Sequence, residues 1–317
     1  MNVIVRTLVL SALLLPFAVS ADEAKPVEAK PVAQTGKARR FLAAGFEHGQ
    51  PQPNQVAIVG LDGKIEWTIP ANNVHDAWLL PNGNILYQND QRIAEVTREK
   101  KEVWSYDSRT MNGNAGKPVS VHAFQRLANG LTMIVESGPA RIIEVDKDGK
   151  IVHQLPLTVD KPNPGRDSRN ARKLASGNYL VCHEGDGKVR EYDPTGKVVW
   201  THETKTMVYG AIRLANGNTL IATGNGNRVI EVTPDHKEVW TIEKNELPGI
   251  TLGWMTQLER LPNGNTIVVN CHAGPKNPQA FEVTPDKKVV WTYNNWVDFG
   301  HCTPVFQTLD DTPGVIR

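Results

Sequence analysis

The segment Leu80-Pro81-Asn82-Gly83-Asn84-Ile85-Leu86 places Asn-Gly between two apolar runs. Both residues tolerate a positive φ, so this pattern is the strongest short signal for a β-hairpin. Related turns follow four other leucines at similar spacing, Leu127, Leu174, Leu214 and Leu261. The sequence therefore predicts five similar hairpins distributed along the chain.

A second repeated segment, Asp62-Gly63-Lys64-Ile65-Glu66-Trp67, lies between these hairpins and predicts a further tight turn and strand. Its six copies recur at intervals of 37, 49, 47, 40 and 51 residues and end in Trp67, Trp104, His153, Trp200, Trp240 and Trp291. A strand with one glutamate precedes five of them, at Glu95, Glu144, Glu191, Glu231 and Glu282. Four short strands per 40–50 residues are typical of a β-propeller.

The predicted fold is all-β, a six-bladed β-propeller of four-stranded blades over residues 41–317. Five blades are continuous, and the sixth is split between the chain ends. Residues 301–309 are expected to supply its innermost strand, and residues 41–46, 56–61 and 64–69 the other three. N-terminal strands pairing with the C-terminal strand would close the ring and remove exposed sheet edges. The repeated tryptophans are expected to pack between blades, and the repeated glutamates to serve structure.

The N-terminus predicts export. Residues 1–21 carry one arginine, a short apolar run and small residues, which together indicate a signal peptide cleaved after Ala21. Residues 22–40 are rich in Ala, Lys, Glu and Pro and are expected to form a disordered linker. The mature protein would be periplasmic or secreted, monomeric, and without a membrane span. With 35 basic and 34 acidic residues, the chain lacks the basic excess that nucleic-acid binding requires.

Histidines gather on one predicted face of the ring. His75 and His122 each precede the turn glycine of their hairpin by eight residues, and His301 begins the innermost strand of the split blade. Two more, His183 and His272, end the second strand of their blades. His48, in a loop of the split blade, falls on the same face, so six of the nine histidines are expected there.

This face is the predicted functional site. Imidazole acts as a base, a nucleophile or a metal ligand near neutral pH, so the candidate catalytic residues are His75, His122 and His301. Arginine beside histidine suits an anion such as sulfate, phosphate or carboxylate. The candidate ligand-binding residues are Asp76, Arg169, Asn170, His183, Tyr209, Trp254 and His272. The loops 105–119, 156–168 and 244–253 lie on the same face and would shape specificity.

The three cysteines are Cys182, Cys271 and Cys302. The predicted topology brings Cys271-His272 close to His301-Cys302. Either a Cys271–Cys302 disulfide or a Cys/His metal site for zinc or copper fits this placement. No motif requires a cofactor, since the chain lacks P-loop, H-E-x-x-H and G-x-S-x-G sequences.

The segment His75-Asp76-Ala77-Trp78-Leu79-Leu80-Pro81-Asn82-Gly83 resembles the blade motif of bacterial arylsulfotransferase-like propellers. The repeat also looks like the wider PQQ-like, or quinoprotein-type, propeller superfamily. The arylsulfotransferase resemblance implies sulfuryl transfer from a phenolic sulfate to a phenol through a sulfated histidine. Carried over, His75, His122 or His301 would be the nucleophile and Arg169 would hold the sulfate.

Two classes of function remain open from the sequence. In the first, the propeller binds a small ligand, such as an anionic or aromatic compound, or a protein partner at the histidine-rich channel mouth. In the second, the same histidines make it an enzyme, either arylsulfotransferase-like or a metal-dependent hydrolase or lyase. The blade repeat accounts for most residues without catalysis, so binding is the favoured hypothesis.

Overall fold

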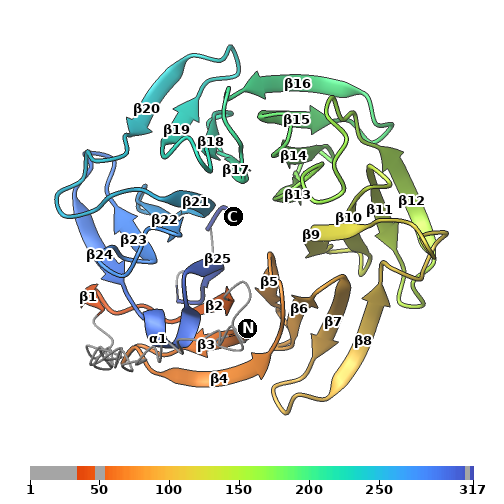
Figure 1. Ribbon diagram of the computed structural model, residues 1–317, viewed down its shortest axis with the longest axis horizontal. Helices are drawn as coiled ribbons and strands as arrows, with labels where there is room; N and C mark the ends of the chain where they lie inside the picture. The colour runs from red at the N-terminus through yellow and green to blue at the C-terminus, as the bar shows by residue number, and fades with distance from the viewer. Residues whose placement is uncertain (1–33, 47–53, 311–314) are drawn as a thin grey trace, which may run out of the picture. The chain divides into compact units, whose positions relative to one another are not determined.

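Short antiparallel strands form six blades arranged as a ring in the computed structural model, which describes residues 34–46, 54–310 and 315–317 (Figure 1). Blade I contains β25 (Cys302–Thr308), β2 (Phe41–Phe46), β3 (Gln55–Val59) and β4 (Ile65–Pro70). Blade II contains β5 (Ala77–Leu79), β6 (Ile85–Asn89), β7 (Arg92–Val96) and β8 (Glu102–Asp107). Blade III contains β9 (Ser120–Arg126), β10 (Thr132–Ser137), β11 (Arg141–Val145) and β12 (Ile151–Pro156).

The remaining blades repeat this order from the channel outward. Blade IV contains β13 (Ala171–Lys173), β14 (Tyr179–His183), β15 (Lys188–Tyr192) and β16 (Val198–Glu203). Blade V contains β17 (Gly210–Arg213), β18 (Thr219–Ala222), β19 (Val229–Val232) and β20 (Glu238–Ile242). Blade VI contains β21 (Trp254–Arg260), β22 (Thr266–Cys271), β23 (Ala280–Val283) and β24 (Val289–Tyr293), with β1 (Thr35–Gly36) added at its outer edge. The short helix α1 (Trp296–Phe299) leads from β24 into β25.

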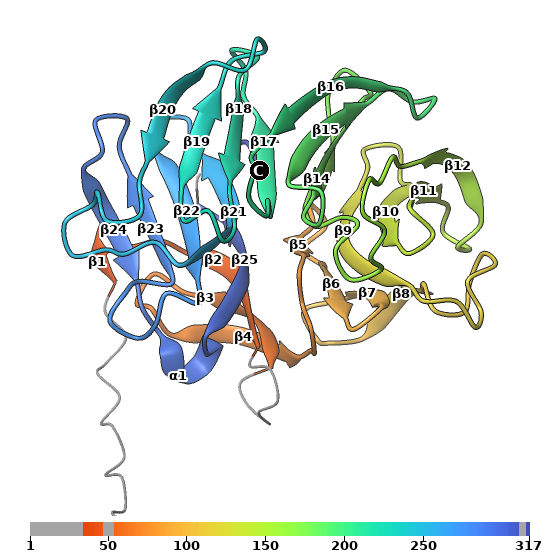
Figure 2. The same ribbon diagram turned by 45° about the horizontal axis from the view of Figure 1, so that its top comes forward.

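The predicted hairpins and the predicted ring closure are both confirmed. At the first Asn-Gly turn, Gly83 has a φ of +84° and its N–H donates to the Leu80 carbonyl at 2.9 Å. Within blade I the C-terminal β25 pairs with the N-terminal β2, with Ala43 opposite Phe306. The ring therefore joins the two ends of the chain inside one sheet, as Figures 1 and 2 show.

The linker prediction fails for residues 34–40. Thr35 and Gly36 form β1, which pairs with β24 of blade VI. Arg39 is buried and its Nε donates to Glu282 at 2.8 Å. This segment therefore completes the junction between blades VI and I. The predicted signal peptide, and the part of the linker before residue 34, lie outside the described residues.

The repeated glutamates join neighbouring blades. Each of the five accepts from a basic side chain that belongs to the next blade or, for Glu282, to the N-terminal segment; the pairs are Glu95–Arg126, Glu144–Lys173, Glu191–Arg213, Glu231–Arg260 and Glu282–Arg39. Four of them also accept from the asparagine that follows their own hairpin glycine, namely Asn84, Asn178, Asn218 and Asn265. The structural role expected for these glutamates is confirmed.

The repeated tryptophans reach to the same junctions from the outermost strands. Trp67, Trp104, Trp200 and Trp240 each donate from Nε1 to a carbonyl in the outer turn of the next blade, at Arg98, Lys147, Pro234 and Pro285. Trp291 of the last blade donates instead to Gln34 Oε1 at 3.0 Å. The predicted packing of tryptophan between blades is confirmed, and Gln34 supplies the final acceptor.

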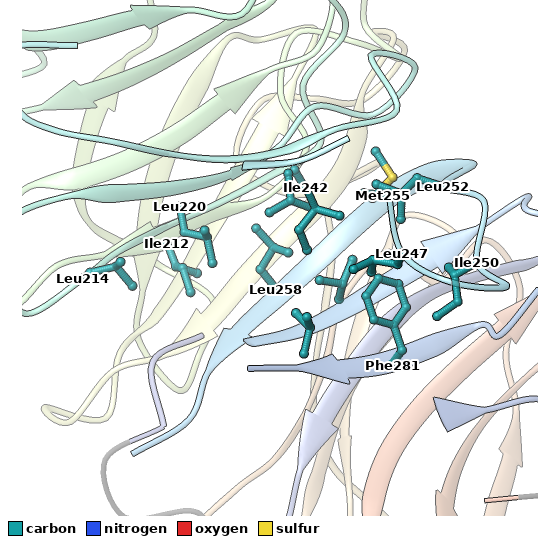
Figure 3. Packing of buried hydrophobic residues seen from close by; sticks show 14 residues of the cluster. Ile212, Leu214, Leu220, Ile242, Leu247, Ile250, Leu252, Met255, Leu258 and Phe281 are labelled. Carbon is teal, nitrogen blue, oxygen red and sulfur yellow. The ribbon is translucent and has the colours of Figure 1, made fainter. Parts of the chain in front are cut away.

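The apolar core lies between the blades. Six clusters of buried side chains each combine residues from two adjacent blades. Figure 3 shows the one between blades V and VI, where Ile212 and Leu220 face Leu258 and Phe281. Burial of each such side chain contributes about 1.5–3 kcal/mol, so the ring is stabilised mainly at its blade junctions. Among the described residues, no helix is long and apolar enough to cross a membrane.

Candidate functional site

A pocket opens where the starts of several innermost strands meet the ends of neighbouring second strands. Its volume is about 280 Å³. Its lining comes from blades I, II, IV, V and VI and from the loop before blade IV; the residues are His75, Arg166, Arg169, Glu184, Tyr209, Trp254, Thr256, Cys271, His272 and Cys302. We call it the mouth pocket. Its lining combines ionisable, aromatic and metal-ligating side chains.

His75 is held by hydrogen bonding and ring packing. Its Nδ1 lies 2.7 Å from the Tyr209 hydroxyl, and its ring meets that of His122 edge to face, with centroids 4.6 Å apart. Burial raises the pKa of Tyr209 well above its usual value. Burial, with Arg169 and His75 nearby, holds the pKa of His122 well below its usual value. The hydroxyl therefore stays protonated and His122 stays neutral at pH 7.

Two arginines share one carboxylate at the pocket wall. Arg169 forms an ion pair with Glu184, and Arg166 Nε lies 3.4 Å from the other oxygen of the same carboxylate. The Arg169 guanidinium also lies over the Tyr209 ring, 5.8 Å from its centroid. Glu184 is almost fully buried, whereas about half of the Arg166 side chain is exposed. Two guanidinium groups against one carboxylate leave this wall with a net positive charge.

Two thiols and an imidazole form another part of the pocket lining. The Cys271 thiol lies 3.2 Å from Cys302 Sγ, and both cysteines are free thiols. The ligand atoms of Cys271, Cys302 and His272 all lie within 4.8 Å of one another. The hydrogen bond from Cys271, together with burial, raises the pKa of Cys302 well above its usual value. Trp254 packs against the two cysteines and adds an aromatic surface.

Five of the predicted site residues line the mouth pocket: His75, Arg169, Tyr209, Trp254 and His272. His122 is not part of the lining, but its ring contacts that of His75. Its Nδ1 lies 2.9 Å from the Ser168 carbonyl oxygen, within hydrogen-bonding distance. The predicted gathering of histidines on one face therefore yields two that line the pocket and one that supports it.

Asp76 lies apart from the mouth pocket. It is fully buried in the channel, where its carboxylate pairs with Arg172 at 2.8 Å and with Arg317 at 3.4 Å. Both guanidinium groups stack on Trp78. This central cluster joins blades II and IV to the C-terminal residue. The structure therefore places Asp76, predicted to bind ligand, in an ion-pair cluster and not in the lining of the mouth pocket.

Three other predicted residues also lie outside the pocket lining. His183 is fully buried, with Nδ1 2.7 Å from the Asp167 carbonyl and Nε2 2.8 Å from the Tyr192 hydroxyl, so both ring nitrogens serve the fold. Asn170 is buried and pairs through its backbone with Tyr209 and Cys182. His301 is exposed, and its ring packs edge to face on Trp296. His48 lies outside the described residues.

Five lining residues were absent from the predicted site residues: Arg166, Glu184, Thr256, Cys271 and Cys302. Glu184 follows His183 directly, so a search of strand ends for charged residues would have found it. Arg166 lies in the loop 156–168, which was expected to shape specificity. The cysteines were predicted to lie near each other, but nothing in the sequence showed that their sulfurs reach the same pocket as His75.

A larger cavity of about 570 Å³ lies beside the hairpin turns of blades IV and V, near the C-terminal residue. Its charged lining residues already pair with the fold: Lys173 with Glu144, Arg213 with Glu191, and Arg172 with Asp76. It holds no histidine or cysteine. The mouth pocket is therefore the better candidate site.

The buried His183 makes stability depend on pH. Burial and the nearby Arg190 lower its pKa from 6.5 to about 4. Below pH 6.5 the unfolded chain takes up a proton that the folded chain refuses until about pH 4. The unfolding free energy should therefore decrease as the pH drops from 6.5 to about 4. His183 should account for about 1 kcal/mol of this decrease per pH unit. Urea unfolding at pH 7, 6 and 5 should show a shallower decline in His183→Gln than in the wild type, and an unchanged slope would contradict this assignment.

The sequence profile of the Mal s 1 allergenic protein-like family matches residues 31–283 of this chain. No curated protein sequence matches the chain. The family match covers all six blade sheets in part or in full and extends into the N-terminal segment that closes the ring.

Solved structures share the propeller fold. A protein of unknown function from Bacteroides caccae is similar with a TM-score of 0.74 and 23% identity, covering 86% of this chain and 99% of that one. A catalytically inactive virginiamycin B lyase from Staphylococcus aureus, solved with quinupristin, is similar with a TM-score of 0.57 and 13% identity, covering 90% and 97%. At these low identities, the similarity shows only that the chains share the propeller fold. Neither of the two matched structures is described as an arylsulfotransferase or a quinoprotein.

Proposed function

This chain belongs to the Mal s 1 allergenic protein-like family, and from that premise we propose that it is an exported propeller that binds a small anion in the mouth pocket. The ligand carries an aromatic or apolar group beside its anionic group. One observation carries the proposal. Arg166 and Arg169 face the same pocket as Trp254, with Glu184 as the single carboxylate in the described lining.

Charge and hydrogen-bond donors favour an anion. Arginine binds carboxylate, sulfate and phosphate oxygens through paired N–H groups, and the half-exposed Arg166 presents its guanidinium to solvent at the pocket. The Tyr209 hydroxyl stays protonated, so it adds a donor rather than a negative charge. An organic cation would meet net repulsion from the two guanidinium groups that share Glu184.

Size and surface define the remainder of the ligand. A volume of 280 Å³ lies just below the usual range for small-molecule sites, so it suits one aromatic ring with an anionic substituent better than a larger ligand. Trp254 adds an aromatic side chain to the same lining. We further propose that the signal-like residues 1–21 direct the protein to the periplasm or the outside of the cell, where it meets such a compound.

The test uses benzoate, phenyl phosphate and 4-nitrophenyl sulfate as probes of the mature protein. At least one should raise the melting temperature of the wild type in a saturable manner. Arg166→Gln should weaken that binding by about tenfold, which corresponds to a lost charge-assisted hydrogen bond. The matched control is Arg109→Gln, which removes another exposed arginine with a carboxylate partner but lies outside the pocket lining. Equal binding by the two variants, or no binding of any probe, would reject the proposal.

A second candidate function, sulfuryl transfer, rests on the contact between His75 and Tyr209. A histidine oriented through Nδ1 by a phenol hydroxyl can accept the sulfuryl group on Nε2: the N–S bond forms as the ester S–O bond breaks, and the phenolate leaves. With 4-nitrophenyl sulfate, this function requires release of 4-nitrophenolate and a sulfuryl adduct on His75. Binding without release assigns the pocket to recognition alone.

A further inference from the structure

We infer that Cys271, Cys302 and His272 form a zinc site whose open coordination position faces the mouth pocket. The three ligand atoms lie within 4.8 Å of one another, and the two sulfurs are 3.2 Å apart. In a tetrahedral zinc site, sulfur and nitrogen ligand atoms are separated by roughly 3.5–3.8 Å. Small side-chain rotations therefore bring all three atoms to bonding distance of one ion.

The backbone places these ligands before any ion binds. Cys271 ends β22 and Cys302 begins β25, so two different blades each supply a thiol. The His272 N–H donates to the His301 carbonyl at 2.8 Å, which holds the two strand ends together. His272 itself adopts a φ of +55°, a conformation that costs a non-glycine residue about 1 kcal/mol. Strain of this kind persists where the neighbouring structure fixes the residue, as at a ligand site.

The donor set favours zinc over magnesium and calcium. Two thiolates and one imidazole are soft to intermediate ligands that suit zinc, whereas magnesium and calcium prefer oxygen. On binding, both thiols lose their protons to solvent, so the two sulfur charges neutralise the dication. The arginine wall therefore remains the positively charged side of the pocket. Cys182 cannot replace either ligand, because it is buried in the apolar cluster between blades IV and V.

Three protein ligands leave the fourth position of a tetrahedral zinc for water or a ligand. All three residues line the same pocket as Arg169 and Tyr209, so that position opens toward the proposed anion. This part of the inference rests on the proposed function: an anionic oxygen of the bound ligand would replace water on zinc. Occupancy of the metal site itself does not require the ligand.

The test is titration of the reduced, chelator-treated protein with Co²⁺, a spectroscopic substitute for zinc. One equivalent should produce thiolate-to-cobalt charge-transfer absorption and the strong visible bands of a tetrahedral site, and Zn²⁺ should abolish both. Cys302→Ser should lose the charge-transfer band, whereas the control Cys182→Ser should keep it. His272→Ala should bind Co²⁺ more than about tenfold more weakly, because even an outer hydrogen-bonding partner of a ligand contributes that much.

Native mass spectrometry of the wild type avoids any failure of a variant to fold. Protein isolated from its own cells should carry one zinc per chain. Three results would overturn the inference: no uptake of Co²⁺ by the reduced protein, a charge-transfer band unchanged in Cys302→Ser, or native protein without metal whose Cys271 and Cys302 are bonded to each other. The probe-binding test with Arg166→Gln is carried out on zinc-free protein as well, so loss of the metal site and loss of the anion site are observed separately.

Discussion

Replacing Trp291 with alanine is expected to lower the unfolding free energy by about 4 kcal/mol, the cost of deleting a fully buried tryptophan. Trp291 packs against Phe41 and Phe306 of blade I, with ring centroids 5.8 Å away in both cases. Its Nε1 also donates to Gln34 at the ring closure. The variant therefore opens a cavity at the junction where the two ends of the chain meet.

The repeat offers its own control for this effect. Trp240 stands at the equivalent position of blade V and donates to the Pro285 carbonyl, but it is only half-buried. Trp240→Ala should therefore cost about 1–2 kcal/mol. Trp291→Phe should recover most of the loss, since it keeps the aromatic burial and gives up the hydrogen bond. Urea unfolding measures the free energy of all three variants. Equal losses of unfolding free energy in the two alanine variants would show that the closing junction contributes no more than the junction at Trp240.

Asp76→Ala is expected to lower the unfolding free energy by about 3–5 kcal/mol, because it leaves two buried guanidinium groups without their carboxylate. The side chains of Arg172 and Arg317 are 5% and 6% exposed. Burial lowers the pKa of Arg317 to about 10, so this arginine still carries its charge at pH 7. The loss should shift the unfolding midpoint strongly while leaving binding to the mouth pocket unchanged.

An exposed ion pair provides the comparison for the Asp76 variant. Asp148 pairs with Lys147 at 2.8 Å, but both side chains are more than half exposed. Asp148→Ala should change the unfolding free energy by no more than about 0.5 kcal/mol. Two results would contradict the structural role of Asp76: a loss of unfolding free energy as small as that of Asp148→Ala, or loss of probe binding without destabilisation. Either result would favour a role for Asp76 in ligand binding.

The fold could be predicted from the sequence because its signals are local. Asn-Gly turns, alternating strands and the recurring tryptophan each act within a few residues, and their spacing alone gives six blades. Even the split blade followed from counting strands at the two ends. The segment 34–40 could not be predicted, because its partners, Glu282 and Trp291, lie about 250 residues away and its composition resembles a solvated linker.

The candidate site was predicted only in part, for a different reason. His183 and His272 occupy the same place at the end of a second strand, yet one is buried between Asp167 and Tyr192 and the other is exposed at the pocket. The position of a histidine in the repeat predicts the face of the blade on which it lies, but not the direction in which its imidazole side chain points. The central cluster was missed because Arg317 enters the channel from the far end of the chain, which no repeat marks.

The conclusion that most needs a direct measurement is that the mouth pocket binds a small aromatic anion. A crystal structure of the mature protein grown with whichever probe raises its melting temperature provides it. The anionic group of the probe should lie beside Arg166 and Arg169, and its ring should lie against Trp254, within the 280 Å³ pocket. A probe bound at another surface, with this pocket left to solvent, would contradict the account.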